Sequence, residues 1–103
     1  MTGPAAGNLS DTGNGCYRLG GSLTMGTVTA LRERGLRAFN AGSGAIEVSL
    51  ANVERADSGA LALLIDWLAW ASAAGRAMKF TSLPAALLAL ARLSDVEDLL
   101  TGR

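Results

Sequence analysis

The residues of this chain best suited to chemistry are Asp57 and Ser58, a carboxylate beside a hydroxyl, with Gly59 directly after them. They stand where a polar segment runs into a long apolar stretch that is expected to be helical. The first turn of a helix presents unpaired backbone N–H groups and the positive end of the helix dipole, and both favour anions. Ser58 is therefore suited to capping the helix or to carrying a phosphate, and Asp57 to a second cap or a partner contact.

Catalysis by these residues is not expected. The chain contains no histidine, which excludes Ser-His and Cys-His catalysis and metal sites built on imidazole. Lys79 is distant in sequence from Ser58, and Asp-Ser-Gly does not match the Gly-x-Ser-x-Gly elbow of hydrolases. The sequence also lacks a paired-carboxylate constellation and a phosphate-binding glycine motif with lysine. We therefore expect a protein without enzymatic activity, cofactor or bound metal.

Two tryptophans, Trp67 and Trp70, lie farther along the same predicted helix. At 100° per residue, the apolar stripe around Leu61 and Leu64 forms one side, and both tryptophans fall nearly opposite it. They can cover the sheet edge or another helix of the domain, or they can form a partner-binding surface. We favour the second interpretation, because the stripe already supplies a core and exposed tryptophans are common at binding hot spots.

Composition limits the protein to a small class. Its 103 residues suit one domain, and the 50% that are hydrophobic can bury a small core. Nine basic and nine acidic residues give a formal net charge of zero, so nothing indicates nucleic-acid binding. The single cysteine, Cys16, fits a reducing compartment. With no apolar run long enough to span a membrane and no secretory signal, the sequence predicts a cytoplasmic protein.

Hydrophobic patterning predicts alternating strands and helices. Residues 1–15 are rich in small polar residues and glycine, and are predicted to form a flexible lead-in with room for a short strand near residues 6–10. Strands are expected at 16–19, 45–50 and 77–81, and helices at 25–39, 59–74 and 84–93, with a short fourth helix from Asp95. Ser58 is the predicted N-cap of the second helix. Over residues 16–103 this order predicts one α/β domain with helices packed on a mostly parallel or mixed sheet.

The strand at 46–50, the short connection and Asp57-Ser58-Gly59 opening a Leu-rich helix resemble the STAS domain, named for sulfate transporters and anti-sigma factor antagonists. The resemblance covers about residues 16–100 and is most specific over residues 46–64. It implies a single domain with a four- to five-stranded mixed sheet and about four helices packed on it. It also implies a role in binding rather than in catalysis.

One branch of that family is similar to this chain over eight consecutive residues. The run from Asp57 to Leu64, Asp-Ser-Gly-Ala-Leu-Ala-Leu-Leu, resembles the Asp-Thr-Gly-Gly-Leu-Ala-Leu-Leu of MlaB, the STAS subunit of a bacterial phospholipid ABC transporter. This implies a subunit that binds and regulates or stabilises the transporter ATPase, and through it the membrane permease, to maintain outer-membrane lipid asymmetry. Ser58 would be the key contact, supported by Asp57. The predicted partner-binding residues are Asp57, Ser58, Gly59, Trp67 and Trp70.

A second branch gives the alternative function. Anti-sigma factor antagonists carry Asp-Ser-Ser/Thr-Gly at this place, and a partner kinase phosphorylates the second hydroxyl residue. Here Gly59 holds that second position, so Ser58 is the available acceptor. This resemblance implies an antagonist that binds an anti-sigma factor kinase and is regulated by phosphorylation of Ser58.

Overall fold

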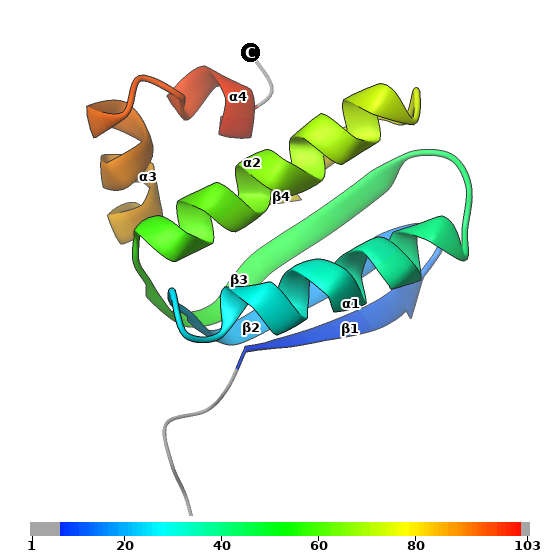
Figure 1. Cartoon of the computed structure of the whole chain (residues 1–103), viewed down its shortest axis with the longest axis horizontal. Helices are drawn as coiled ribbons and strands as arrows, with labels where there is room; N and C mark the ends of the chain where they lie inside the picture. Colours follow the sequence, from blue (N-terminus) through cyan, green and yellow to red (C-terminus); the bar gives the residue numbers. More distant parts are fainter. Residues whose placement is uncertain (1–6, 102–103) are drawn as a thin grey trace, which may run out of the picture.

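A four-stranded mixed sheet forms one layer of the protein, and helices cover one of its faces (Figure 1). The computed structural model describes residues 7–101. The elements in chain order are β1 (Asn8–Gly13), β2 (Cys16–Leu23), α1 (Val28–Asn40), β3 (Ile46–Ala56), α2 (Ser58–Ala73), β4 (Met78–Thr81), α3 (Ala85–Leu93) and α4 (Glu97–Thr101). The predicted α/β architecture with a mixed sheet and four helices is confirmed.

The strands lie in the order β1-β2-β3-β4. β1 pairs antiparallel with β2, whereas β2 with β3 and β3 with β4 are parallel. Helices α1 and α2 form the two parallel crossovers, and both crossovers step across the sheet in the same direction. Since such connections are right-handed, both helices come to lie on the same face, with α2 between α1 and the α3–α4 pair (Figure 1).

The core lies between the sheet and these helices. Along β3, Ile46, Val48 and Leu50 are buried under the helices, while Glu47 and Ser49 alternate with them on the opposite, partly exposed face. The helices add the other large buried side chains, among them Leu31, Phe39, Leu64, Trp67 and Leu87. Helix α2 contributes to the core along most of its length, because neighbours flank it on both sides.

Residues 7–15 differ in part from the prediction. We expected a flexible lead-in over 1–15 with room for a short strand near residues 6–10, and Asn8–Gly13 form the longer strand β1, whose Leu9 pairs with Leu19 of β2. The domain therefore begins before residue 16, because even a polar strand gains a backbone ladder by pairing at the edge of a sheet. Residues 1–6 of that lead-in, and residues 102–103 at the other end, lie outside the described residues.

Two helix starts also differ. The first helix was predicted from residue 25 but begins at Val28, because the Thr27 hydroxyl donates to Ser22 O at 2.7 Å and holds residues 24–27 in a turn. The fourth was predicted from Asp95 but begins at Glu97, since Asp95 has a left-handed backbone with φ 59°. Within residues 7–101, no helix combines the length and apolar character needed to cross a membrane.

Candidate functional site

Asp57 caps helix α2. Its backbone is extended, with φ −129° and ψ −164°, and its Oδ1 accepts a hydrogen bond from Gly59 N at 2.7 Å. Its backbone carbonyl accepts the first helical hydrogen bond, from Ala60 N at 2.9 Å. The prediction that Ser58 is the N-cap is therefore wrong by one residue. Asp57 stands first in the chain where the backbone turns into the helix, and a carboxylate caps at least as well as a hydroxyl.

Ser58 is consequently the first helical residue, and its side chain is exposed. Among residues 7–101, its hydroxyl finds no hydrogen-bond partner. It lies at the positive end of the helix dipole, close to backbone N–H groups that favour negative charge. With the cap supplied by Asp57, the hydroxyl of Ser58 is available to a partner or to a modifying enzyme.

The same site includes the β2–α1 connection, residues 24–27. The second carboxylate oxygen of Asp57, Oδ2, accepts a hydrogen bond from Met25 N at 3.3 Å. Gly59 is buried beneath this connection, and a Cβ placed on it would stand 2.8 Å from Met25 N. Met25 itself is 69% exposed. Met25 was predicted to start the first helix, although the run Gly-Ser-Leu-Thr-Met-Gly-Thr carries the residues typical of a turn.

From Ser58 onward, α2 presents a continuous exposed face. Its residues, here called the outer face of α2, are Ser58, Ala62, Asp66, Ala69, Ser72 and Ala73. Asp66 is the single charged residue in this set, and its Oδ2 lies 3.2 Å from Arg32 Nε of α1. An exposed helix face is usually rich in charged residues. The outer face of α2 instead carries five alanine or serine residues and one charged residue over four turns.

Trp67 does not belong to that surface. It is fully buried, its ring packs against Gly35 of α1, and its Nε1 donates to Arg32 O at 3.3 Å. The prediction that Trp67 faces away from the core is therefore wrong. Helix α1 lies along that side of α2, and the absence of a side chain at Gly35 makes the room that the indole occupies.

Trp70 is half-buried at the other end of α2. Its ring lies 5.7 Å from that of Phe39, and the Arg76 guanidinium stands 5.5 Å from its centroid. Arg76 is fixed in turn, because its Nη1 donates to Phe39 O at 2.6 Å and its Nε to Gly44 O at 2.8 Å. Trp70 is thus partly accessible, and its ring contacts Phe39 and Arg76.

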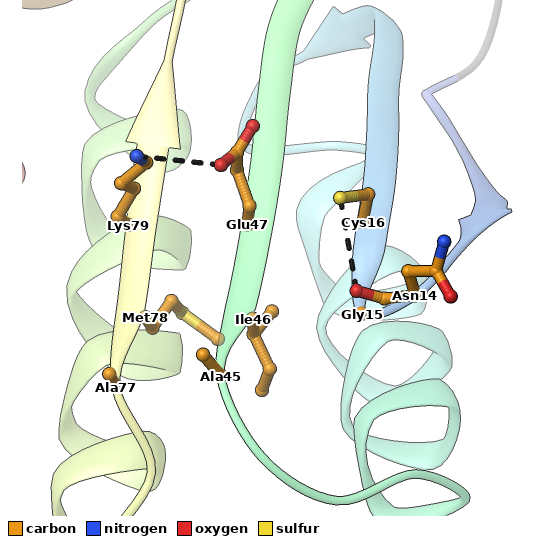
Figure 2. Close-up of a pocket in the computed structure, with 9 residues that line it drawn as sticks. All are labelled: Asn14, Gly15, Cys16, Ala45, Ile46, Glu47, Ala77, Met78 and Lys79. Carbon is orange, nitrogen blue, oxygen red and sulfur yellow. Dashed lines mark hydrogen bonds and ion pairs between the residues drawn. The ribbon is translucent and has the colours of Figure 1, made fainter.

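A shallow pocket opens at the opposite end of the parallel strands, where β2, β3 and β4 begin (Figure 2). Glu47 and Lys79 line it and pair with each other at 3.5 Å, and Cys16 Sγ lies 4.0 Å from Asn14 O. Glu47 and Lys79 are thus partnered with each other, and the Cys16 thiol faces a backbone carbonyl (Figure 2). In open α/β sheets, ligands bind beyond the carboxyl ends of the strands. Asp57 and Ser58 directly follow the carboxyl end of β3, whereas this pocket lies at the amino ends of the strands.

Comparison with protein families decides the relationship. A family model described as "Mlab, STAS domain" matches residues 11–101, from β1 to the last residue of α4. The chain belongs to this family. No curated protein matches it with significant similarity. The match confirms the resemblance drawn from the sequence, and members of this STAS family are generally binding domains rather than catalysts.

Proposed function

We propose that this MlaB-like protein binds the ATPase subunit of a phospholipid ABC transporter through the outer face of α2, beginning at Ser58. The observation that carries the proposal is the exposed Ser58 hydroxyl, which no residue within 7–101 binds, at the start of a helix face with one charged residue. Docking there would regulate or stabilise the ATPase. Through that ATPase and its permease, the protein would serve outer-membrane lipid asymmetry without entering the membrane.

The composition of this face suits a close protein contact. Alanine side chains at positions 62, 69 and 73 let a partner approach the helix, and little polar surface has to be dehydrated on binding. The Ser58 hydroxyl can both donate and accept a hydrogen bond, which gives the contact direction. Trp70 adds an aromatic edge at the far end of the helix. Trp67 takes no part in this proposal, since its side chain is buried.

Co-purification with the ATPase tests the proposal. Wild-type protein should co-elute with the transporter ATPase, and Ser58→Ala should weaken the complex. Ala62→Glu, which puts a charge and extra volume on the outer face of α2, should abolish it. The matched control is Ala89→Glu, because Ala89 is also an exposed alanine within a helix, but in α3. Wild type eluting without the ATPase would contradict the proposal, and so would equal loss of binding in both glutamate variants.

Phosphorylation of Ser58 is the second candidate function, in a protein that binds an anti-sigma factor kinase. It is supported by the exposed hydroxyl at the first position of α2, where the helix dipole would stabilise a phosphate. Incubation with such a kinase and ATP should add the mass of one phosphate to wild type and none to Ser58→Ala. An unchanged intact mass for wild type would exclude this regulation by that kinase.

A further inference from the structure

We propose that Asp57 and Gly59 act through the β2–α1 connection, holding Met25 beside Ser58 as an apolar contact for the same ATPase partner. The inference rests on the proposed function and adds to it a residue, Met25, and a division of roles. Ser58 and Met25 touch the partner, whereas Asp57 and Gly59 are positioning residues.

The carboxylate of Asp57 is occupied within the protein. One oxygen accepts from Gly59 N at 2.7 Å and the other from Met25 N at 3.3 Å. The first bond caps α2, and the second ties the connection to the start of the helix. With both oxygens bound to backbone N–H groups, the negative charge is compensated locally. Asp57 is therefore better suited to joining the two segments than to binding a partner directly.

Gly59 allows the two segments to come close. A Cβ at this position would stand 2.8 Å from Met25 N, closer than real Cβ atoms approach other atoms, and 3.0 Å from Met25 Cα. A glycine here permits that approach, which brings Met25 N within reach of the Asp57 carboxylate. Ser58 lies in sequence between Asp57 and Gly59, which both meet the Met25 backbone, so the Met25 backbone lies near the first turn of α2.

The connection is held from its other side as well. The Thr27 hydroxyl donates to Ser22 O at 2.7 Å and accepts from Thr24 N at 3.0 Å, and Asp57 N donates to Leu23 O at 3.2 Å. Met25 thus sits on an ordered backbone while its side chain is 69% exposed. Binding through such a residue orders one side chain and no loop, which keeps the entropic cost low.

The chemistry of Met25 and Ser58 specifies what they fit. A flexible thioether fills irregular apolar hollows, and a hydroxyl beside it fixes orientation by a hydrogen bond. Asp57 precedes Ser58 and contacts Met25 N, and both of its carboxylate oxygens are bound by backbone N–H groups. The partner surface that matches is an apolar hollow with one polar group at its rim.

A double-mutant cycle on ATPase binding tests the division of roles. Asp57→Asn keeps a carbonyl oxygen for Gly59 N, and Asn caps helices as well as Asp, but its amide group cannot accept from Met25 N. Met25→Ala and Asp57→Asn should each weaken binding by about tenfold, and the double variant by hardly more than either one, because both changes remove the same contact. Additive losses would mean that Asp57 contacts the partner itself, which overturns the proposal.

Two further measurements separate this inference from the function on which it rests. Leu93→Ala removes another exposed apolar side chain, 86% accessible, and should leave binding unchanged. Amide hydrogen exchange at Met25 in the isolated protein should be faster in Asp57→Asn than in wild type, at equal global stability. Unchanged exchange overturns the positioning role whether or not the ATPase binds. Absence of wild-type binding, with the exchange difference present, overturns the proposed function and the contact role of Met25, but leaves the tether between Asp57 and Met25 intact.

Discussion

Ser58 at the start of helix α2 and the two tryptophans farther along it differ in their exposure to solvent. At its start, Ser58 is exposed, and so is Met25 of the β2–α1 connection, whose backbone N donates to Asp57. Toward its other end, Trp67 is fully buried and Trp70 half-buried, and both rings lie against Phe39 of α1, at centroid distances of 5.2 and 5.7 Å. The aromatic side chains of α2 thus pack into the domain, whereas the Ser58 side chain at its start faces outward.

This difference shows that a neighbouring helix, more than α2 itself, decides which of its residues are accessible. Gly35 of α1 has no side chain, and the Trp67 ring occupies the space that one would need. A Cβ on Gly35 would lie 2.7 Å from Cε2 of the indole. At the start of α2, the β2–α1 connection packs against Gly59 and leaves Ser58 uncovered. A glycine marks the close approach at each end: Gly35 makes room for a ring, and Gly59 makes room for backbone.

The largest expected effect comes from removing the buried ring. Trp67→Ala should lower the free energy of unfolding by about 3–5 kcal/mol, because it leaves a cavity between α1 and α2 and removes the hydrogen bond to Arg32 O. Trp70→Ala should cost roughly half as much, since part of that ring is already in water. Urea unfolding followed by circular dichroism measures both variants. Equal costs would contradict the contrast between the two tryptophans.

Adding a side chain at Gly35, where the Trp67 ring packs, should have the next largest effect on stability. Gly35→Ala should destabilise by about 1–3 kcal/mol through overpacking against Trp67, although alanine favours a helix over glycine by about 1 kcal/mol. In a Trp67→Leu background the clash is relieved, and the same substitution should then be neutral or stabilising. Gly42→Ala is the control, because a Cβ there meets nothing within 4 Å. The change of sign between backgrounds is the decisive outcome.

Much of the fold could be predicted from the sequence because its signals are local. Period-two alternation predicted β3 and the Leu-rich run predicted α2, whose C-cap is Ala74, followed by Gly75 with a φ of 69°. β1 was only partly anticipated, since Asn8–Gly13 carries one large apolar residue, Leu9, and depends on β2 for its pairing. An element with its own apolar pattern can be predicted from its residues alone, whereas an edge strand that depends on its neighbour cannot.

The site was predictable in part for the same reason. The sequence points to Asp57, Ser58 and Gly59 as a helix start, and the structure places all three there, with the cap shifted by one residue. The burial of Trp67 could not be foreseen, since it depends on which helix lies beside α2 and on Gly35 being aligned with it. Met25 was missed because its exposure results from a turn that a helical pattern hides.

The smallest expected effect concerns Tyr17, the one tyrosine of the chain, which packs near the aromatic residues of α2. Tyr17 is buried, its ring meets Phe39 edge-on at 5.0 Å, and its hydroxyl donates to Ala38 O at 3.3 Å. Burial raises the pKa of this phenol above 10.0, nearby Asp11 raises it further, and Arg76 lowers it. The pKa of Tyr17 is higher in the folded protein than in the unfolded chain. Its contribution to the free energy of unfolding is therefore fully present below about pH 10 and is lost as the pH rises through the raised pKa.

Tyr17→Phe should therefore act in two separable ways. Below pH 10 it should cost about 0.5–1.5 kcal/mol for the lost hydrogen bond. Above pH 10 the difference in free energy of unfolding between wild type and variant should become smaller, because wild type loses stability as Tyr17 ionises and phenylalanine has no proton to lose. Because the chain holds one tyrosine, phenolate absorbance follows Tyr17 alone, and Asp11→Asn should bring its pKa down. A phenol that titrates in the folded protein as it does in the unfolded chain would place Tyr17 in water, and would break the assignment of this end of α2 to the core.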